Sequence, residues 1–153
     1  MEEIRTVDLT KADLGFYKKQ LADVVILTSV GKLYLQQRPL NWRTHPGVVN
    51  LFGGHVEVGE TAVDAAAREI REETGGTPSP ENLLFIGAIT ESWTEHTELV
   101  HVYFWHDKAK TITGCYEAEL IEFETVQGAL SHPKLMTYAK WALEECERRN
   151  LIS

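Results

Sequence analysis

Basic residues are scarce in this sequence. Its 153 residues include 15 lysines and arginines against 23 aspartates and glutamates, which gives a net charge of −8. Such a charge argues against unassisted binding to a long nucleic acid, because that ligand needs a basic surface. A small nucleotide is not excluded, since bound metal ions can invert the local field.

Cysteines and long apolar runs are also lacking. The two cysteines, Cys115 and Cys146, lie far apart and in no CxxC spacing, so we expect neither a disulfide framework nor a zinc site. No apolar run approaches the length of a membrane span, and Met1-Glu2-Glu3 is followed by no apolar segment. These features predict a cytoplasmic protein without membrane contact. Separately, we expect a monomer or homodimer.

Repeats, low-complexity tracts and Pro/Ser-rich linkers are absent as well, which predicts one domain over residues 1–153. Apolar runs predict strands at 24–27, 33–38, 47–52, 83–89, 99–105 and 120–123. Helices are predicted at 10–21, at 61–74 and from Pro133 onward. Thr61 is the expected N-cap of the second helix, and Gly75-Gly76 its stop. Strands on both sides of a central helix favour an α/β sandwich with a mixed sheet.

The chemistry concentrates in residues 68–73, R-E-I-R-E-E. At 100° per residue, Glu69, Glu72 and Glu73 share one helix face, where like charges repel by roughly 0.2–0.5 kcal/mol per i,i+4 pair. A divalent cation would offset that cost. Ligands that are all oxygen favour Mg²⁺ or Mn²⁺ over zinc. A mixed charged face is also typical of a solvated surface, so the flanking residues have to decide.

The same helix should have a second, apolar face for the core, formed by Val63, Ala67, Ile70 and Thr74. Arg68 precedes Glu72 by four residues and is expected to pair with it. Before the helix, Gly53-Gly54 allows backbone to approach the acidic face, where a carbonyl would be a further oxygen ligand.

The flanking residues complete a pattern. Gly54, Glu60, 68–70, 72–73 and Gly75 fit G-x5-E-x7-R-E-U-x-E-E-x-G-U, in which U is aliphatic, and only the last position, Gly76, departs. This 23-residue motif is highly specific, and the chain therefore resembles a Nudix hydrolase. That family cleaves nucleoside diphosphates linked to another moiety. The departure at Gly76 removes no ligand.

The resemblance implies an α/β/α sandwich with a catalytic loop-helix-loop. It implies that Glu69, Glu72 and Glu73 bind Mg²⁺, with the Gly54 carbonyl often joining them. Arg68 would orient these glutamates, and Glu60 would have a supporting role. The implied reaction is attack of water on a phosphorus of a pyrophosphate, in which Glu72, Glu73 and Arg68 belong to the catalytic set.

The general base is left open. The segment 115–119 resembles the one that supplies a glutamate base in triphosphate-cleaving members, which puts Glu117 forward and Glu119 beside it. Other branches of the family take the base from a loop such as 90–98, so Glu91, Glu95 and Glu98 are further candidates. Each of these is equally interpretable as a surface carboxylate.

Three residues are candidates for substrate binding. Arg38 ends a predicted strand where nucleotide-cleaving relatives often carry an arginine, and Trp42 in the following loop is suited to stacking on a base. Ser131 precedes His132-Pro133, where relatives that act on oxidised guanine nucleotides carry an asparagine. Strand-end charge explains Arg38 as well, and a partly buried surface position explains Trp42. Ser131 has fewer hydrogen-bonding groups than the asparagine, which disfavours selectivity for oxidised guanine.

Three functions follow for comparison. The favoured one is Mg²⁺-dependent hydrolysis of a nucleoside diphosphate-X substrate, above all a (deoxy)nucleoside triphosphate giving the monophosphate and pyrophosphate. A nucleotide sugar or ADP-ribose is the alternative substrate, and the acidic charge disfavours processing of RNA 5′ ends. From another class, a non-catalytic nucleotide-binding module would be expected to lose the motif glutamates, which are present here.

Overall fold

The computed structural model describes residues 2–153, so Met1 lies outside it. Its strands are β1 Ile4–Val7, β2 Lys19–Leu27, β3 Leu33–Gln37, β4 Val49–Asn50, β5 Phe52–His55, β6 Leu84–Glu91, β7 Glu98–His106 and β8 Glu119–Phe123. Its helices are α1 Ala62–Thr74, α2 Val126–Leu130 and α3 Thr137–Arg148. Within residues 2–153, no helix combines the length and hydropathy that crossing a bilayer requires.

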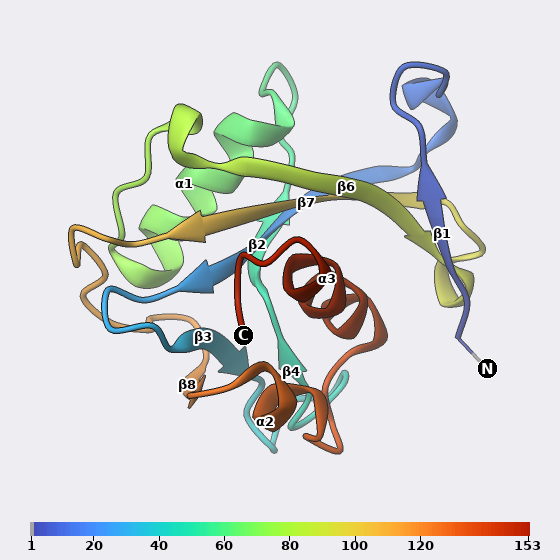
Figure 1. The fold of residues 1–153 in the computed structure, drawn as a ribbon. Helices are drawn as coiled ribbons and strands as arrows, with labels where there is room; N and C mark the ends of the chain where they lie inside the picture. Colours follow the sequence, from blue (N-terminus) through green and yellow to red (C-terminus); the bar gives the residue numbers. More distant parts are fainter. Residues whose placement is uncertain (1) are drawn as a thin grey trace.

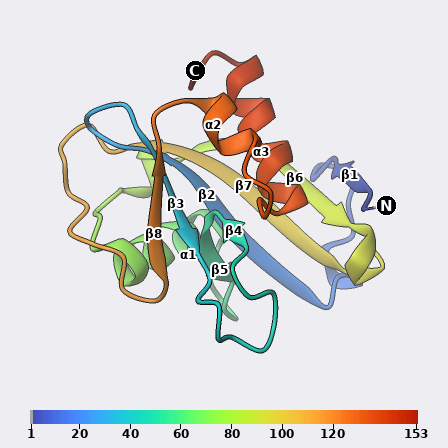
Figure 2. The same cartoon turned by 90° about the horizontal axis from the view of Figure 1, so that it is seen from below.

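The strands form one mixed sheet in the order β1-β6-β7-β2-β3-β4 (Figure 1). The parallel pair is β2 with β7, and the other neighbours are antiparallel. Strand β2 changes partner along its other edge, because residues 21–24 pair with β5 and residues 26–27 pair with β3. Strand β5 therefore continues the edge of β2 where β3 leaves it, and lies next to α1 (Figure 2).

Helices α1 and α3 cover opposite faces of the sheet (Figure 2). Alternate residues of β7 show this, since Val102 and Phe104 pack in the core shared with α3, whereas Tyr103 and Trp105 pack in the core shared with α1. The predicted α/β sandwich with a mixed sheet is confirmed.

The central helix also begins and ends as predicted. Thr61 Oγ1 accepts a hydrogen bond from Asp64 N at 3.2 Å, and Gly75 adopts the left-handed conformation with φ of 74°. The Gly75 N–H closes the last turn on the carbonyl of Arg71 at 3.0 Å. The N-cap at Thr61 and the stop at Gly75 each act within a few residues of the helix end, and tertiary contacts do not override them.

The helix predicted at 10–21 is wrong. Only Leu14–Phe16 forms a single 3₁₀ turn, which Asp13 caps, and β2 already begins at Lys19. Residues 19–21 hydrogen-bond to β7, and Leu21 also pairs with β5, so the sheet satisfies backbone groups that a helix would need. Phe16 in this turn is left exposed.

The last helix begins later than predicted, at Thr137 instead of Pro133. Residues 134–136 are extended because they pair with the backbone of Val49. The Val49 N–H donates to the Lys134 carbonyl at 2.9 Å, and the Val49 carbonyl accepts from the Met136 N–H at 3.0 Å. Strand β1 and helix α2 were not predicted. They contain only four and five residues, too few to show a clear periodicity.

Candidate active site

The three acidic residues of α1 lie in different environments. Glu73 is 3% exposed, the side chain of Glu69 is 14% exposed and that of Glu72 is 52% exposed. The expectation that Glu73 faces away from the core is therefore wrong. Its Oε1 accepts a hydrogen bond from Gly53 N at 3.1 Å, and its Oε2 accepts from Gln36 Nε2 at 3.2 Å. Glu73 thus joins α1 to β5 and β3 beneath the surface.

Glu73 belongs to a cluster of three carboxylates. One oxygen each of Glu69, Glu73 and Glu117 lies within 4.8 Å of the other two. Burial, together with the neighbouring carboxylate of Glu69, raises the pKa of Glu73 well above its usual range. Like charges at this separation are stable only with protons or a cation between them. The cluster fits a hard divalent cation, because every donor is an oxygen.

Gly54 shapes one wall of the cluster. A Cβ at this position would lie 2.5 Å from Oε1 of Glu69, so only glycine lets that carboxylate rest against the backbone of β5. This close approach places the Glu69 carboxylate against the main chain of β5, whose carbonyl groups are also hard oxygen ligands. Gly54 and Glu69 therefore lie together, as the sequence predicts.

Arg68 holds the cluster from the solvent side. Its Nε donates to Oε2 of Glu60 at 2.8 Å, its Nη2 donates to Oε1 of Glu60 at 3.0 Å, and its Nη1 donates to Oε1 of Glu69 at 2.9 Å. The predicted pair with Glu72 is present but longer, at 3.3 Å. The hydrogen bonds from Arg68 are the largest cause of the fall in the pKa of Glu60, to about 2. Glu60 thus anchors the arginine that orients Glu69.

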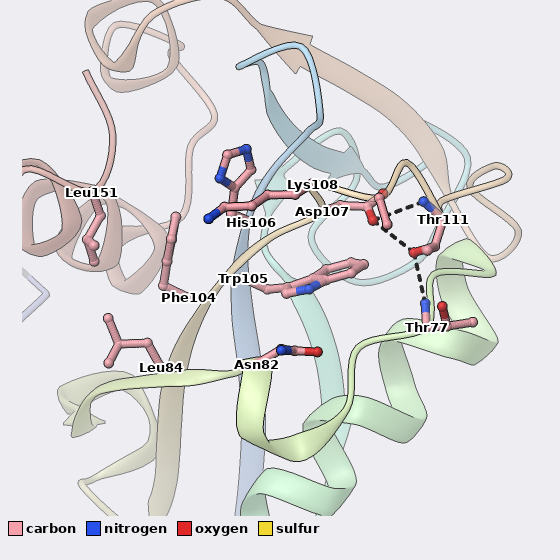
Figure 3. A pocket seen from close by; sticks show the side chains of 11 residues that line it. Thr77, Asn82, Leu84, Phe104, Trp105, His106, Asp107, Lys108, Thr111 and Leu151 are labelled. Atoms are coloured by element: carbon pink, nitrogen blue, oxygen red, sulfur yellow. Dashed lines mark hydrogen bonds between the residues drawn. The ribbon is translucent and has the colours of Figure 1, made fainter.

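The loop between β7 and β8 brings Glu117 to α1. It begins at the buried carboxylate of Asp107, which accepts hydrogen bonds from N and Oγ1 of Thr111 at 2.9 and 2.8 Å (Figure 3). Further along, Thr113 N donates to the carbonyl of Thr74 at 2.8 Å, and Tyr116 N donates to the carbonyl of Glu73 at 2.9 Å. The loop therefore docks on the C-terminal end of α1 and supplies the third carboxylate.

The other candidate bases lie elsewhere. Glu119 is exposed at the start of β8, and Glu95 is exposed in the loop after β6. Glu91 and Glu98 line a cavity of about 390 Å³ between β2, β7 and the start of α3. Of the five glutamates that the sequence left open, Glu117 is the one that the structure brings to Glu69 and Glu73.

Gly53 connects the cavity lined by Glu91 and Glu98 to the carboxylate cluster, because its N–H donates to Glu73. Gly53 pairs with Asp23 across β5 and β2, and Asp23 lines the cavity. Sequence reasoning missed Asp23, Asn50 and Tyr138, which also line it. One signal was available for Asp23, because an aspartate inside the apolar run L-A-D-V-V-I-L is costly to bury without a role.

The predicted substrate-binding residues differ in position. Arg38 lines the cavity, and its guanidinium group lies 4.2 Å from the ring centre of Trp42. Trp42 itself is partly exposed and does not belong to the lining. Ser131 ends α2, where its Oγ donates to the carbonyl of Gly128 at 3.1 Å, and it is not among the lining residues either.

The departure at Gly76 has a packing explanation. A Cβ at Gly76 would lie 2.8 Å from the indole ring of Trp105, which occupies the place of an aliphatic side chain. Trp105 also borders a second cavity of about 420 Å³ near the C-terminal end of β7 (Figure 3). Among the residues that line this second cavity, none belongs to the carboxylate cluster.

Comparison with known proteins agrees with the motif and the fold. The model of the NUDIX domain matches residues 18–143. The chain belongs to the Nudix family. The Nudix match covers both α1 and the loop that carries Glu117.

Several relatives share parts of this Nudix chain. An uncharacterized Nudix hydrolase of Nostoc is 30% identical over 58% of the chain and 53% of its own length. An ADP-ribose pyrophosphatase of Methanocaldococcus jannaschii is 38% identical over 50% of the chain and 46% of its own length. The chain thus spans about half the length of these curated relatives. The crystal structure of a MutT protein from Methanosarcina mazei aligns with a TM-score of 0.68 at 23% identity, over 90% of this chain and 99% of that one, which shows the shared fold.

Proposed function

We propose that this Nudix protein hydrolyses a pyrophosphate bond of a nucleoside diphosphate-X substrate with Mg²⁺ or Mn²⁺. The observation that carries the proposal is the meeting of Glu69, Glu73 and Glu117 within 4.8 Å, beside Gly54 and next to a cavity. Bringing three carboxylates together around the buried Glu73 without a cation nearby is costly, and their oxygen atoms suit a hard divalent ion.

Each residue has a part in this proposal. Glu69, Glu72, Glu73 and the Gly54 carbonyl hold the metal, which when bound neutralises charge on the pyrophosphate and acts as a Lewis acid. Glu117, the most exposed of the clustered carboxylates, accepts the proton of the attacking water. Arg68 fixes the rotamer of Glu69 through its anchor on Glu60. Arg38, at the cavity, contacts the phosphates.

A (deoxy)nucleoside triphosphate is the favoured substrate, giving the monophosphate and pyrophosphate. Its support is the position of Glu117 in the cluster and of Arg38 at the cavity. ADP-ribose or a nucleotide sugar is the second candidate, which the partial similarity to an ADP-ribose pyrophosphatase favours. Trp42 and Ser131 lie outside the cavity lining and contribute to either substrate only if the loops that carry them move.

The same proposal covers the setting of the enzyme. Residues 1–153 form one Nudix domain that works in the cytoplasm as a monomer or homodimer on a small nucleotide. Its net charge of −8 makes a long nucleic acid a poor partner.

A panel of nucleotides with Mg²⁺ tests the proposal. It should include the triphosphates of all common bases, ADP-ribose and nucleotide sugars, with the products separated by chromatography. Monophosphate and pyrophosphate from a triphosphate would support the favoured substrate, and release of AMP from ADP-ribose would support the second. Tight binding without hydrolysis of any compound would contradict enzymatic function and favour a binding module.

A further inference from the structure

Strand β3 directs two polar side chains toward α1. Residues two apart share one face of a strand, so Tyr34 and Gln36 lie on the face toward α1, whereas Leu35 packs in the core shared with α3. The Gln36 amide reaches Glu73. The Tyr34 hydroxyl reaches the loop that carries Glu117. One strand therefore contacts both the buried and the exposed member of the carboxylate cluster.

The amide of Gln36 fixes the side chain of Glu73. Its Nε2 donates to the carbonyl of Leu51 at 2.8 Å and to Oε2 of Glu73 at 3.2 Å, which uses both N–H groups of the amide. The Leu51 carbonyl can only accept, so it forces the nitrogen of the amide, and not the oxygen, toward Glu73. The other oxygen of Glu73 accepts from Gly53 N at 3.1 Å. With a donor on each oxygen, the carboxylate cannot rotate without breaking a hydrogen bond.

The hydroxyl of Tyr34 anchors the loop that carries Glu117. It donates to the carbonyl of Gly114 at 2.7 Å. Its ring is buried and stacks on Phe52, with the ring centres 5.4 Å apart, so the hydroxyl has little freedom to move. The N–H of Gly114 donates to the carbonyl of Thr74 at 3.1 Å. Both backbone polar groups of Gly114 are thus bound three residues before Glu117.

Strand β3 also holds the chain after Glu117. Strand β8 begins at Glu119 and runs antiparallel to β3, with Glu119 opposite Gln37 (Figure 2). Glu117 therefore lies in a short segment that is attached to β3 at both ends, by Tyr34 before it and by strand pairing after it. Loss of the Tyr34 hydroxyl would free the first attachment and leave the second.

We propose that Gln36 and Tyr34 are positioning residues for the two ends of the carboxylate cluster. Gln36 holds Glu73 in the rotamer that points into the cluster, and Tyr34 holds the loop so that Glu117 joins it. This inference rests on the proposed function for the roles of the two glutamates. A misplacement of about 1 Å can lower a rate about 10²-fold, so side chains that do not touch the substrate control turnover. The two residues should act on different steps, Gln36 on metal binding and Tyr34 on proton transfer.

Mn²⁺ affinity, measured by electron paramagnetic resonance, tests Gln36 without turnover. Gln36→Met keeps the length of the side chain and removes both donors, and we expect the affinity to fall about tenfold or more. Gln37→Met is the matched control, because the Gln37 amide donates to the carbonyl of Gly47 at 3.1 Å, away from the cluster. Gln36→Asn, which is too short to bridge the same groups, replaces Gln36→Met if the latter does not fold. Wild-type affinity within about threefold in the folded variant, or loss of folding in both, would overturn the inference for Gln36.

The effect on kcat and KM tests Tyr34. Tyr34→Phe removes only the hydroxyl group, and we expect kcat to fall about tenfold or more, while KM and Mn²⁺ affinity stay within about twofold of the wild type. Tyr103→Phe removes a hydroxyl from the same core cluster and should keep wild-type kcat. In a Glu117→Gln background, Tyr34→Phe should lower kcat no further, because the loop no longer holds a base. An equal loss in both backgrounds, or wild-type kcat in Tyr34→Phe, would overturn the inference for Tyr34.

The outcome is separable from that of the proposed function. A wild-type protein that hydrolyses no nucleotide would contradict the function and the role of Tyr34 with it, whereas Mn²⁺ affinity would still decide the role of Gln36. Hydrolysis by the wild type that folded Gln36→Met and Tyr34→Phe variants match would support the function and overturn the positioning roles.

Discussion

Gly54 and Glu69 fit together only because Gly54 has no side chain, since a Cβ would lie 2.5 Å from Oε1 of Glu69. The contact joins β5 to α1, because the Glu69 carboxylate packs directly against the backbone of β5. It makes glycine at this position a requirement of the site and not only of the turn.

Gly54→Ala should therefore damage the site more than the fold. The added methyl group displaces the Glu69 carboxylate, and we expect metal affinity to fall by about 10–100-fold, as for residues that support metal ligands. Titration with Mn²⁺, followed by electron paramagnetic resonance, measures this directly. Gly128→Ala in α2, where a Cβ meets nothing closer than 3.2 Å, is the control. Equal Mn²⁺ affinity in wild type and Gly54→Ala would contradict this role.

Replacing Gly76 with the aliphatic residue that the family motif carries at this position should destabilise the protein. Gly76→Val places a side chain against the indole ring of Trp105, and overpacking of this kind costs about 1–3 kcal/mol. Urea unfolding of Gly76→Val, Trp105→Leu and the double variant forms a cycle that isolates the clash. The free energies of the two single variants should add up to more destabilisation than the double variant shows. Simple additivity would mean that Trp105 is not the reason for glycine.

The raised pKa values of Asp23, Glu73 and Glu91 predict a pH dependence of stability. Unfolded carboxyl groups lose their protons near pH 4, whereas Asp23 and Glu91 keep theirs in the folded protein up to about pH 7, and Glu73 is shifted in the same direction. Between these values the folded state binds more protons, so the free energy of unfolding falls as pH rises. Without divalent ions, Tm should decrease from pH 5.5 to pH 8.

Mg²⁺ provides the complementary test of that trend. A ligand that binds the folded state stabilises it according to its affinity, and ionised carboxylates bind a cation better than protonated ones. The rise in Tm on adding Mg²⁺ should therefore be larger at pH 8 than at pH 5.5. A Tm that increases with pH in the absence of metal would show that the buried acids are not protonated as their burial implies.

The parts of the site that local sequence determines were predictable. The caps of α1 act within four residues, and the motif places Gly54, Arg68 and Glu69 at fixed spacing, so their association follows from the sequence. The burial of Glu73 was not predictable from the charge pattern, which groups it with Glu69 and Glu72. The burial of Glu73 depends on hydrogen bonds from Gly53 of β5 and Gln36 of β3, which are distant from α1 in the sequence.

The cavity shows the same limit more strongly. Asp23, Asn50 and Tyr138 belong to β2, β4 and α3, and no pattern in the sequence connects them. The wrong helix at 10–21 has a related cause, because the pairing of Lys19 with β7 spans almost eighty residues and outweighs a helical spacing of apolar side chains. Pairing between strands that are distant in the sequence therefore determines secondary structure where the spacing of apolar residues is ambiguous.

The turnover of Glu73→Gln with Mg²⁺ and the best substrate of the nucleotide panel tests the central claim most directly. The amide keeps the shape and the hydrogen bond from Gly53 but removes the charge that faces the cation, and we expect kcat to fall by about 10²–10³-fold or more. A circular dichroism spectrum and Tm close to those of the wild type would show that the fold is kept, and Glu144→Gln should retain full activity. Wild-type turnover in a folded Glu73→Gln variant would contradict the assignment of the carboxylate cluster as the catalytic metal site.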